Sequence, residues 1–135
     1  MTDQVGFTAT LVIGSPSVYI HVTVKEMREA TFAILTALAD APRHGYGIIA
    51  EVADVSDGHV RLLAGTLYTA LERLRSEGLI DLEREEIVQG RLRRFYALTD
   101  SGKTVLHDEA ERRRTSAQRA LQRLSPKPAS PLGQS

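Results

Sequence analysis

The feature that most constrains the fold is a turn dipeptide, Gln89-Gly90, set between two segments with the character of β-strands. The segments run roughly over residues 79–88 and 92–98, and the second is rich in residues that suit a pleated surface. A two-residue connection of this kind joins neighbouring antiparallel strands, so it indicates a β-hairpin. The fold must therefore carry a hairpin in the second half of the chain.

Three helical segments precede this hairpin. The first is predicted over residues 25–41, where apolar side chains recur at three- and four-residue spacings up to Pro42, which pushes the residue before it out of the helical region. A second is predicted over residues 44–55. The third carries buried leucines over residues 63–74 and ends at Gly78, which suits a left-handed helix cap. Three short helices followed by a hairpin is the order of a winged helix-turn-helix domain.

The two ends of the chain have sequence patterns that differ from that of this middle part. Residues 99–124 predict one last helix, with capping side chains at its start. Residues 125–135 contain three prolines among polar residues and predict a flexible tail. Residues 1–24 form either an added strand or hairpin, or a poorly ordered extension. The predicted fold is mainly α with a small β-hairpin: a winged helix-turn-helix domain over residues 25–98, followed by a dimerisation helix.

Composition excludes several classes of function. With 17 basic and 17 acidic residues the formal net charge is zero, so a nucleic-acid partner depends on where the charges lie. The absence of cysteine excludes disulfides, thiolate zinc sites and cysteine nucleophiles. The four histidines lack metal-ligand spacing, and no nucleophile has an evident base and orienting group. We expect no metal, no cofactor and no catalysis.

The sequence also indicates where in the cell the protein is located. No stretch approaches the roughly 18 apolar residues of a membrane span. The N-terminus carries Asp3 rather than the basic residues of a secretory signal. We therefore expect a cytoplasmic protein with no membrane partner.

Four short motifs, in register, resemble one family. Residues 44–49 read His-Gly-Tyr-Gly-Ile-Ile and residues 65–68 read Gly-Thr-Leu-Tyr; Leu-Glu-Arg-Leu follows at 71–74, and residues 90–99 read Gly-Arg-Leu-Arg-Arg-Phe-Tyr-Ala-Leu-Thr. In this order the chain resembles, over about residues 27–124, the PadR family of bacterial transcriptional regulators, in its short branch with a single C-terminal helix. The resemblance implies a winged-helix domain that binds DNA, a C-terminal dimerisation helix, and repression often relieved by a small molecule.

Two features depart from the family pattern. Thr69 follows the Gly-Thr-Leu-Tyr motif where the family usually has proline. The N-terminal extension over residues 1–24 is also outside the common pattern, which leaves the N-terminal dimer contacts open.

The third helix is the predicted reading helix. An α-helix fits the DNA major groove if one face is buried and the other is offered to the bases. Hydroxyl groups and a glycine on the offered face suit phosphates, base edges and thymine methyl groups. Such a face also suits an ordinary solvated helix, and the Gly-Thr-Leu-Tyr motif favours the DNA interpretation. The candidate DNA contacts outside the hairpin are Tyr46, Arg61, Gly65, Thr66, Tyr68, Thr69 and Arg73.

The hairpin supplies a second set of candidates. Arg91, Arg93 and Arg94 cluster beside the turn, where basic side chains can follow the phosphate backbone or enter the minor groove. Strand alternation puts Arg93 and Arg94 on opposite faces, so we expect them to differ in role. Either one can instead pair with Glu85 or Glu86 on the facing strand.

The last helix carries a thin apolar seam that Arg113 interrupts. A helix gains most of its stability from packing, so we expect this seam to pack against the first helix of a second copy. Two reading helices would then face successive major grooves and require a roughly palindromic operator. The candidate dimer residues are Met27, Ile34, Leu38, Leu106, Ala110, Ala117, Leu121 and Leu124.

The sequence thus predicts a sequence-specific DNA-binding transcriptional regulator. We expect a repressor with double-stranded DNA and a second copy of itself as partners, released by a small-molecule effector, for which a pocket between the first and last helices is one candidate site. The alternative is a winged helix that binds another protein and has no DNA target of its own. Zero net charge favours that alternative, whereas the hairpin arginines and the Gly-Thr-Leu-Tyr motif oppose it.

Overall fold

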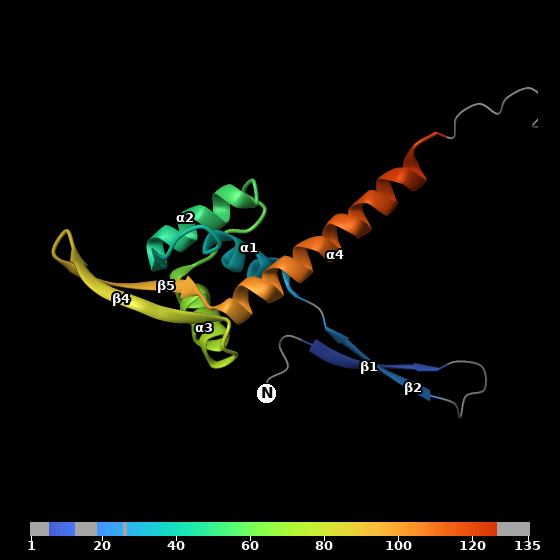
Figure 1. Cartoon of the computed structure of the whole chain (residues 1–135), viewed down its shortest axis with the longest axis horizontal. Coiled ribbons are helices and arrows are strands. Elements are labelled where there is room, and N and C mark those ends of the chain that lie inside the picture. Colours follow the sequence, from blue (N-terminus) through green and yellow to red (C-terminus); the bar gives the residue numbers. More distant parts are fainter. Residues whose placement is uncertain (1–5, 13–18, 26, 127–135) are drawn as a thin grey trace, which may run out of the picture.

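The computed structural model describes residues 6–12, 19–25 and 27–126, and within them it forms four helices and two small antiparallel sheets (Figure 1). One sheet pairs the first two strands, and the other has the strand order β3-β5-β4. The elements are β1 Gly6–Val12, β2 Tyr19–Lys25, α1 Glu29–Ala37, β3 Arg43–His44, α2 Gly45–Val55, α3 Ala64–Ser76, β4 Ile80–Val88, β5 Arg91–Leu98 and α4 Asp100–Leu124.

The core lies where α1, α2 and α3 meet the inner end of the second sheet. Its largest fully buried side chains are aliphatic, as the scarcity of aromatic residues requires. They are Ile34, Leu35, Ile48, Val52, Leu67, Leu71, Leu74 and Ile80. Three helices that precede a β-hairpin in the chain and share a core with it confirm the predicted winged-helix fold, mainly helical with a small sheet.

The first helix is shorter than the predicted segment 25–41. Lys25 belongs to β2, and α1 starts only at Glu29. At its other end the backbone tightens, because the N–H of Ala39 donates to the carbonyl oxygen of Thr36 at 3.1 Å, three residues back instead of four. Periodicity alone did not reveal either boundary.

The hairpin of β4 and β5, which we call the wing, has the predicted turn. Gln89 and Gly90 adopt φ values of 52° and 77°, and two consecutive positive φ angles are what a two-residue hairpin turn of type I′ requires. The register shifts between Leu82 and Arg84, which indicates a bulge. The two-residue strand β3 pairs with β5 and was not predicted, since two residues carry no periodic signal.

The segment before residue 25, whose structure the sequence left open, contains a hairpin in the described residues. β1 and β2 run antiparallel, with Gly6 opposite Lys25 and Val12 opposite Tyr19. The turn expected between them and the tail over residues 127–135 lie outside the described residues.

Side-chain chemistry at Thr99 starts α4 as predicted. Its Oγ1 accepts a hydrogen bond from the backbone N–H of Gly102 at 2.9 Å and donates to the carbonyl oxygen of Gly78 at 2.6 Å. Gly78 itself has φ of 78°, the left-handed cap expected at the end of α3. A Cβ on Gly102 would overlap the carbonyl oxygen of Leu79, so this helix can approach the sheet only with glycine there.

Arg113 attaches α4 to α1. Its guanidinium lies 4.0 Å from the ring centre of Phe32, its Nε donates to Glu109 at 2.7 Å, and its Nη2 donates to the carbonyl oxygen of Met27 at 2.9 Å. Beyond this point α4 extends away from the body (Figure 1), and its side chains from residue 114 to 124 are exposed. Within the described residues, no helix is both long and apolar enough to cross a membrane.

Candidate nucleic-acid interface

Helix α3 buries one face and exposes the other. Leu67, Leu71 and Leu74 point into the core, whereas Thr66 and Thr69 are exposed together with Gly65 and Tyr68. This confirms the two faces that the leucine spacing predicts within α3, whereas the prediction that Leu63 is buried is wrong, because this residue precedes the helix.

The start of α3 lacks a side-chain cap. Leu63 occupies the N-cap position, makes no capping hydrogen bond and is 78% exposed, and the first turn contains no acidic residue. The first backbone N–H groups of a helix have no partner within it. At this end of α3 they therefore remain available to an anion such as a phosphate oxygen.

Arg73 does not lie on the reading face in the way the sequence suggested. Its Nη2 donates to the hydroxyl of Thr31 on α1 at 3.0 Å, and its Nη1 lies 3.8 Å from Glu77. Tertiary contacts thus hold this guanidinium against α1, and the structure corrects the expectation that Arg73 is free to reach a base or phosphate.

The three wing arginines have different surroundings. Arg91 is exposed beside the turn and makes no ion pair within the part of the chain that the structure describes. Arg94 donates to Glu85 at 3.0 Å, which confirms that one of the arginines pairs with the facing strand. Arg93 instead places its guanidinium 5.0 Å from the ring centre of Tyr46 at the start of α2.

A pocket of about 410 Å³ lies where the wing meets the start of α2 and the exposed side of α3. It brings together three predicted DNA contacts, Tyr68, Arg93 and Arg94. A Cβ on Gly45 would overlap the Tyr68 hydroxyl, so glycine at this position lets the phenol ring pack against α2. The lining residues are His44, Gly45, Tyr68, Glu72, Leu92, Arg93, Arg94 and Tyr96.

We compared the sequence with models of known protein families. Residues 34–108 match the transcriptional regulator PadR-like family, more than half of the chain. The chain belongs to the PadR-like family.

Relatives of this PadR-like protein include a 37.1 kDa protein of transposon TN4556 from Streptomyces fradiae, 45% identical over 82 residues. The match covers 61% of this chain but only 22% of that longer protein. The transcriptional regulator Rv3488 of Mycobacterium tuberculosis is 36% identical over 76 residues, with coverage of 56% of this chain and 67% of that protein. The family and the Mycobacterium relative carry the names of transcriptional regulators, not of enzymes.

Solved structures agree with the family match. A PadR family regulator from Clostridium difficile R20291 aligns with a TM-score of 0.60 and 27% identity, over 73% of this chain and all of that one. Bacillus subtilis PadR, solved in complex with operator DNA, aligns with a TM-score of 0.55 and 25% identity over 80% of this chain and 54% of that one.

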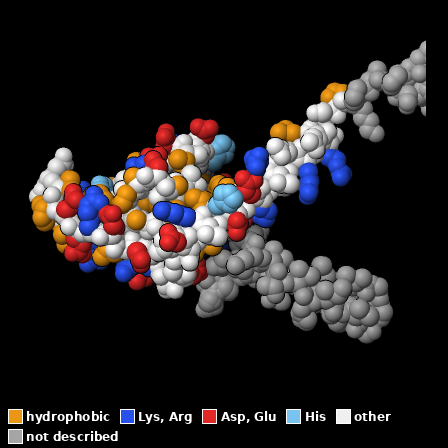
Figure 2. Space-filling model, in the orientation of Figure 1, with side chains coloured by type: hydrophobic (Ala, Val, Ile, Leu, Met, Phe, Trp, Pro, Cys, Tyr) orange, Lys and Arg blue, Asp and Glu red, His pale blue; other side chains and the backbone are white. Residues whose placement is uncertain are grey.

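The other predicted contacts of this PadR-like protein lie at the edges of the surface. Tyr46 is 55% exposed at the start of α2, with one ring face toward Arg93. Arg61 is exposed in the segment before α3, where its guanidinium lies beside the turn at Gly58. Figure 2 shows that basic and acidic side chains are interspersed over the visible face of the body, in keeping with zero net charge.

His44, the first residue of the His-Gly-Tyr-Gly motif, also lines this pocket. Its Nδ1 accepts a hydrogen bond from the N–H of Gly47 at 3.3 Å and so caps α2, and its ring packs in a T-shaped arrangement with Phe95, with centroids 5.2 Å apart. Burial, and then the nearby charge of Arg93, lower the pKa of His44 below its ordinary value of 6.5. The imidazole is therefore neutral at neutral pH.

Two lining residues were missed as site residues. Glu72 on α3 and Leu92 on β5 both line the pocket, and neither is among the candidate DNA contacts. Strand pairing places Leu92 opposite Ile87, and both are exposed near the wing tip, by 57% and 68%. Their apolar character in a strand pattern predicts burial, so no signal in the sequence indicates that they form a projecting tip.

The predicted dimer residues divide into two groups. Ile34 and Leu38 are 0% and 3% exposed within a single chain, so they belong to its own core and have no surface to offer a second copy. This corrects the expectation. Met27 and Leu106 are partly buried against the same core. The members of the seam that are exposed are Ala110, Ala117, Leu121 and Leu124.

No group of three or more histidine, aspartate or glutamate side chains within the described ranges is arranged to hold a metal ion.

Proposed function

We propose that this PadR-like chain is a sequence-reading DNA-binding repressor that acts as a dimer. The observation that carries the proposal is the exposed face of α3, with Gly65, Thr66, Tyr68 and Thr69, together with a wing that shares a pocket with Tyr68 and carries the exposed Arg91 at its turn. A helix with this face can enter a major groove while the wing follows the neighbouring backbone. That Bacillus subtilis PadR has been solved with operator DNA supports the same use of the fold here.

The distal half of α4 supports the dimer. Leu121 and Leu124 are 66% and 80% exposed on a helix that extends from the body. An exposed apolar seam on this part of the helix, where all side chains from residue 114 to 124 are exposed, gains stability by packing on another copy. A twofold dimer presents two copies of α3, and its operator is then roughly palindromic.

A recess beside α3 supports release by a small molecule. It measures about 330 Å³ and is lined by α1 and α3, including Thr31, Thr66, Thr69 and Arg73. The sequence suggested a pocket between the first and last helices, whereas α4 supplies none of this lining. An effector here would contact two hydroxyls of the reading face, so that its binding and DNA binding would compete.

The test is binding of the purified protein to the duplex upstream of its own gene, followed by fluorescence anisotropy against a scrambled duplex of equal length. Thr66→Ala should weaken specific binding severalfold, because a single hydrogen bond from a hydroxyl contributes about 0.5–1.5 kcal/mol. Thr115→Ala, the same change on the exposed side of α4, is the matched control and should bind as the parent does.

Two outcomes would contradict the proposal. If Thr66→Ala and Thr115→Ala bind equally well, α3 does not read the DNA. If the folded dimer binds no duplex even at low salt, the protein-interaction alternative takes its place. Zero net charge and the exposed apolar pair Ile87 and Leu92 at the wing tip favour that alternative.

A further inference from the structure

A single stripe of residues runs along the middle of the exposed face of α3. Its members follow one another at spacings of four and three residues, lie opposite the buried leucines and are all exposed. They are Gly65, Thr69, Glu72 and Ser76. A helix that lies in a major groove with this face inward turns the stripe toward the base edges. Glu72 is thus placed where a base contact is expected, although it is an acid.

The two hydroxyl groups of this stripe are already used within the helix. The Oγ1 of Thr69 donates to the carbonyl oxygen of Gly65 at 3.0 Å, and the Oγ of Ser76 donates to the carbonyl oxygen of Arg73 at 2.7 Å. Each hydroxyl has only one proton to give. Glu72, in contrast, makes no hydrogen bond or ion pair within the described residues, so both of its carboxylate oxygens remain available as acceptors.

The arginines nearest to Glu72 in the binding pocket have other partners. Glu72 lines the pocket between the wing, α2 and α3 together with Arg93 and Arg94. Arg94 donates to Glu85 at 3.0 Å, and the guanidinium of Arg93 lies 5.0 Å from the ring centre of Tyr46. Glu72 therefore places a negative charge without an ion pair on the surface assigned to DNA. Phosphates repel such a charge, so it weakens DNA binding unless the carboxylate accepts a hydrogen bond from a base.

The base edges in the major groove differ in what they offer to a carboxylate. An ionised carboxylate can only accept hydrogen bonds. Guanine presents the acceptors N7 and O6, and thymine presents the acceptor O4. Adenine has an amino donor, but its N7 acceptor lies beside that group, whereas cytosine presents its 4-amino donor alone. Cytosine is therefore the base that best matches Glu72.

We propose that Glu72 determines specificity by accepting a hydrogen bond from the 4-amino group of one cytosine in each operator half-site. This inference rests on the proposed function and adds to it a base that the operator contains. The charge of Glu72 also disfavours every sequence that lacks this cytosine, because the carboxylate then enters the groove without a donor. Discrimination thus comes from repulsion at the wrong sites as well as from attraction at the right one.

The first experiment selects binding sites from a random duplex library, so it requires no known operator. The parent protein should enrich a motif with cytosine at one fixed position of each half-site. Glu72→Ala should lose this preference, keep the rest of the motif and bind a scrambled duplex severalfold more tightly, because the repulsion is removed. Glu72→Gln should instead prefer adenine at this position, since an amide matches its N6 and N7. A damaged fold would produce neither tighter binding nor a new preference.

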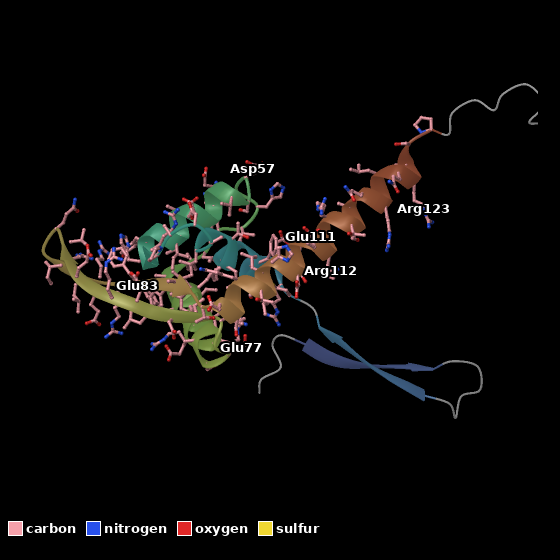
Figure 3. All side chains as sticks on the ribbon, viewed as in Figure 1. Asp57, Glu77, Glu83, Glu111, Arg112 and Arg123 are labelled. Carbon is pink, nitrogen blue, oxygen red and sulfur yellow. The ribbon has the colours of Figure 1, made fainter. Side chains whose placement is uncertain are left out.

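A thermodynamic cycle on the selected duplex measures the contact itself. Exchange of the C·G pair for T·A puts the thymine O4 in place of the amino group. This exchange should weaken binding of the parent about tenfold or more, and binding of Glu72→Ala by less than about twofold. Glu111→Gln removes the same charge from α4, away from the wing (Figure 3), and should keep the motif and both affinities of the parent.

The outcomes distinguish this inference from the proposed function. A parent protein that enriches no sequence contradicts the proposed function, and the role of Glu72 fails with it. If the parent enriches a motif and Glu72→Ala enriches the same motif with the cytosine retained, the chain reads DNA but Glu72 does not, and only this inference is overturned. Because Glu72 is exposed and makes no ion pair within the described residues, Glu72→Ala should unfold at the same urea concentration as the parent.

Discussion

Two arginines in this protein lie over aromatic rings, and their surroundings differ. Arg113 on α4 lies 4.0 Å from the ring centre of Phe32, and Arg93 on the wing lies 5.0 Å from that of Tyr46. Around Arg113 every guanidinium nitrogen has an acceptor, with Glu109, Glu29 and the carbonyl oxygen of Met27 in turn, at 2.7 to 2.9 Å. The Nε of Arg93 has none within the described residues.

We call the contact of α4 with α1 the structural junction, and the contact of the wing with α2 and α3 the binding junction. A cation whose donors are all satisfied contributes to the fold and has nothing left to offer a ligand. The facing acids Glu86 and Glu85 pair with Arg84 and Arg94, so the charge of Arg93 has no carboxylate partner among the described residues. On this basis the contact of α4 with α1 holds the molecule together, whereas the wing and its contact with α2 and α3 belong to the surface where we propose that DNA binds.

The largest effect is expected from Arg113→Ala. The change leaves Glu109, which is 9% exposed, with fewer donors, and removes the contacts of α4 with Glu29 and Phe32 of α1 and with the carbonyl oxygen of Met27. Because Arg112 still donates to Glu109, the loss should be that of hydrogen bonds to charged groups, about 1.5–3 kcal/mol of unfolding free energy. Urea denaturation followed by circular dichroism measures it. Arg123→Ala, an exposed arginine on the same helix, should change the stability by less than about 0.5 kcal/mol.

A second prediction concerns the packing of the binding junction. Gly45→Ala places a Cβ where the Tyr68 hydroxyl lies, and because this end of a half-exposed side chain can turn aside, the shift should cost less than about 1 kcal/mol. Thermal unfolding measures the loss, and combining it with Tyr68→Ala should recover part of it. Gly65→Ala is the control, since a Cβ there meets no atom within 4 Å. It should stabilise α3 by up to about 1 kcal/mol, and an equal loss at both glycines would remove this packing argument.

A third prediction compares how the two junctions lose stability as the pH falls. Hydrogen bonds from Arg112 and then Arg113, against the opposing effect of burial, hold the pKa of Glu109 below its ordinary 4.5. The pKa of His44 lies below 6.5, chiefly through burial. In each case the unfolded chain binds more protons than the folded one, so stability falls as the pH falls. The His44 contribution is lost from pH 6.5 downward, and that of Glu109 only below pH 4.5.

Unfolding experiments at about pH 7.5, 5.5 and 3.5 measure both windows. His44→Asn keeps an acceptor for the N–H of Gly47 and cannot take up a proton, so it should flatten the change between the first two pH values. Glu109→Gln should leave that change in place and reduce the change between the last two. The assignment fails if His44→Asn retains the full loss of stability in mild acid.

The parts of the fold that sequence predicted are those governed by local chemistry. Gln89-Gly90 specified the wing turn, and Gly78 and Thr99 specified the end of α3 and the start of α4. Each acts through its own backbone angles or a hydrogen bond to a near neighbour. β3 was missed because its pairing with β5 joins residues far apart in the sequence.

For the candidate site, the sequence predicted which side of a helix is exposed but not which residues each side chain contacts. Leucine spacing identified the exposed side of α3, yet it could not show that Arg73 turns back to Thr31 on α1. The same spacing cannot distinguish a stripe that faces the chain's own core from one that faces a second copy, which is why Ile34 was misassigned. Arg113 was taken as an interruption of a seam because its partners come from the start of α1.

The most direct test of the assigned DNA-binding surface is to add the operator duplex to labelled protein and record which amide and side-chain resonances change. We predict that Thr66, Tyr68 and Thr69 on α3 and Arg91 on the wing change most, whereas Arg113 and its surroundings on α1 and α4 change little. The opposite pattern, with the largest changes around Arg113 and none on α3 or the wing, would contradict the assignment of the DNA-binding surface.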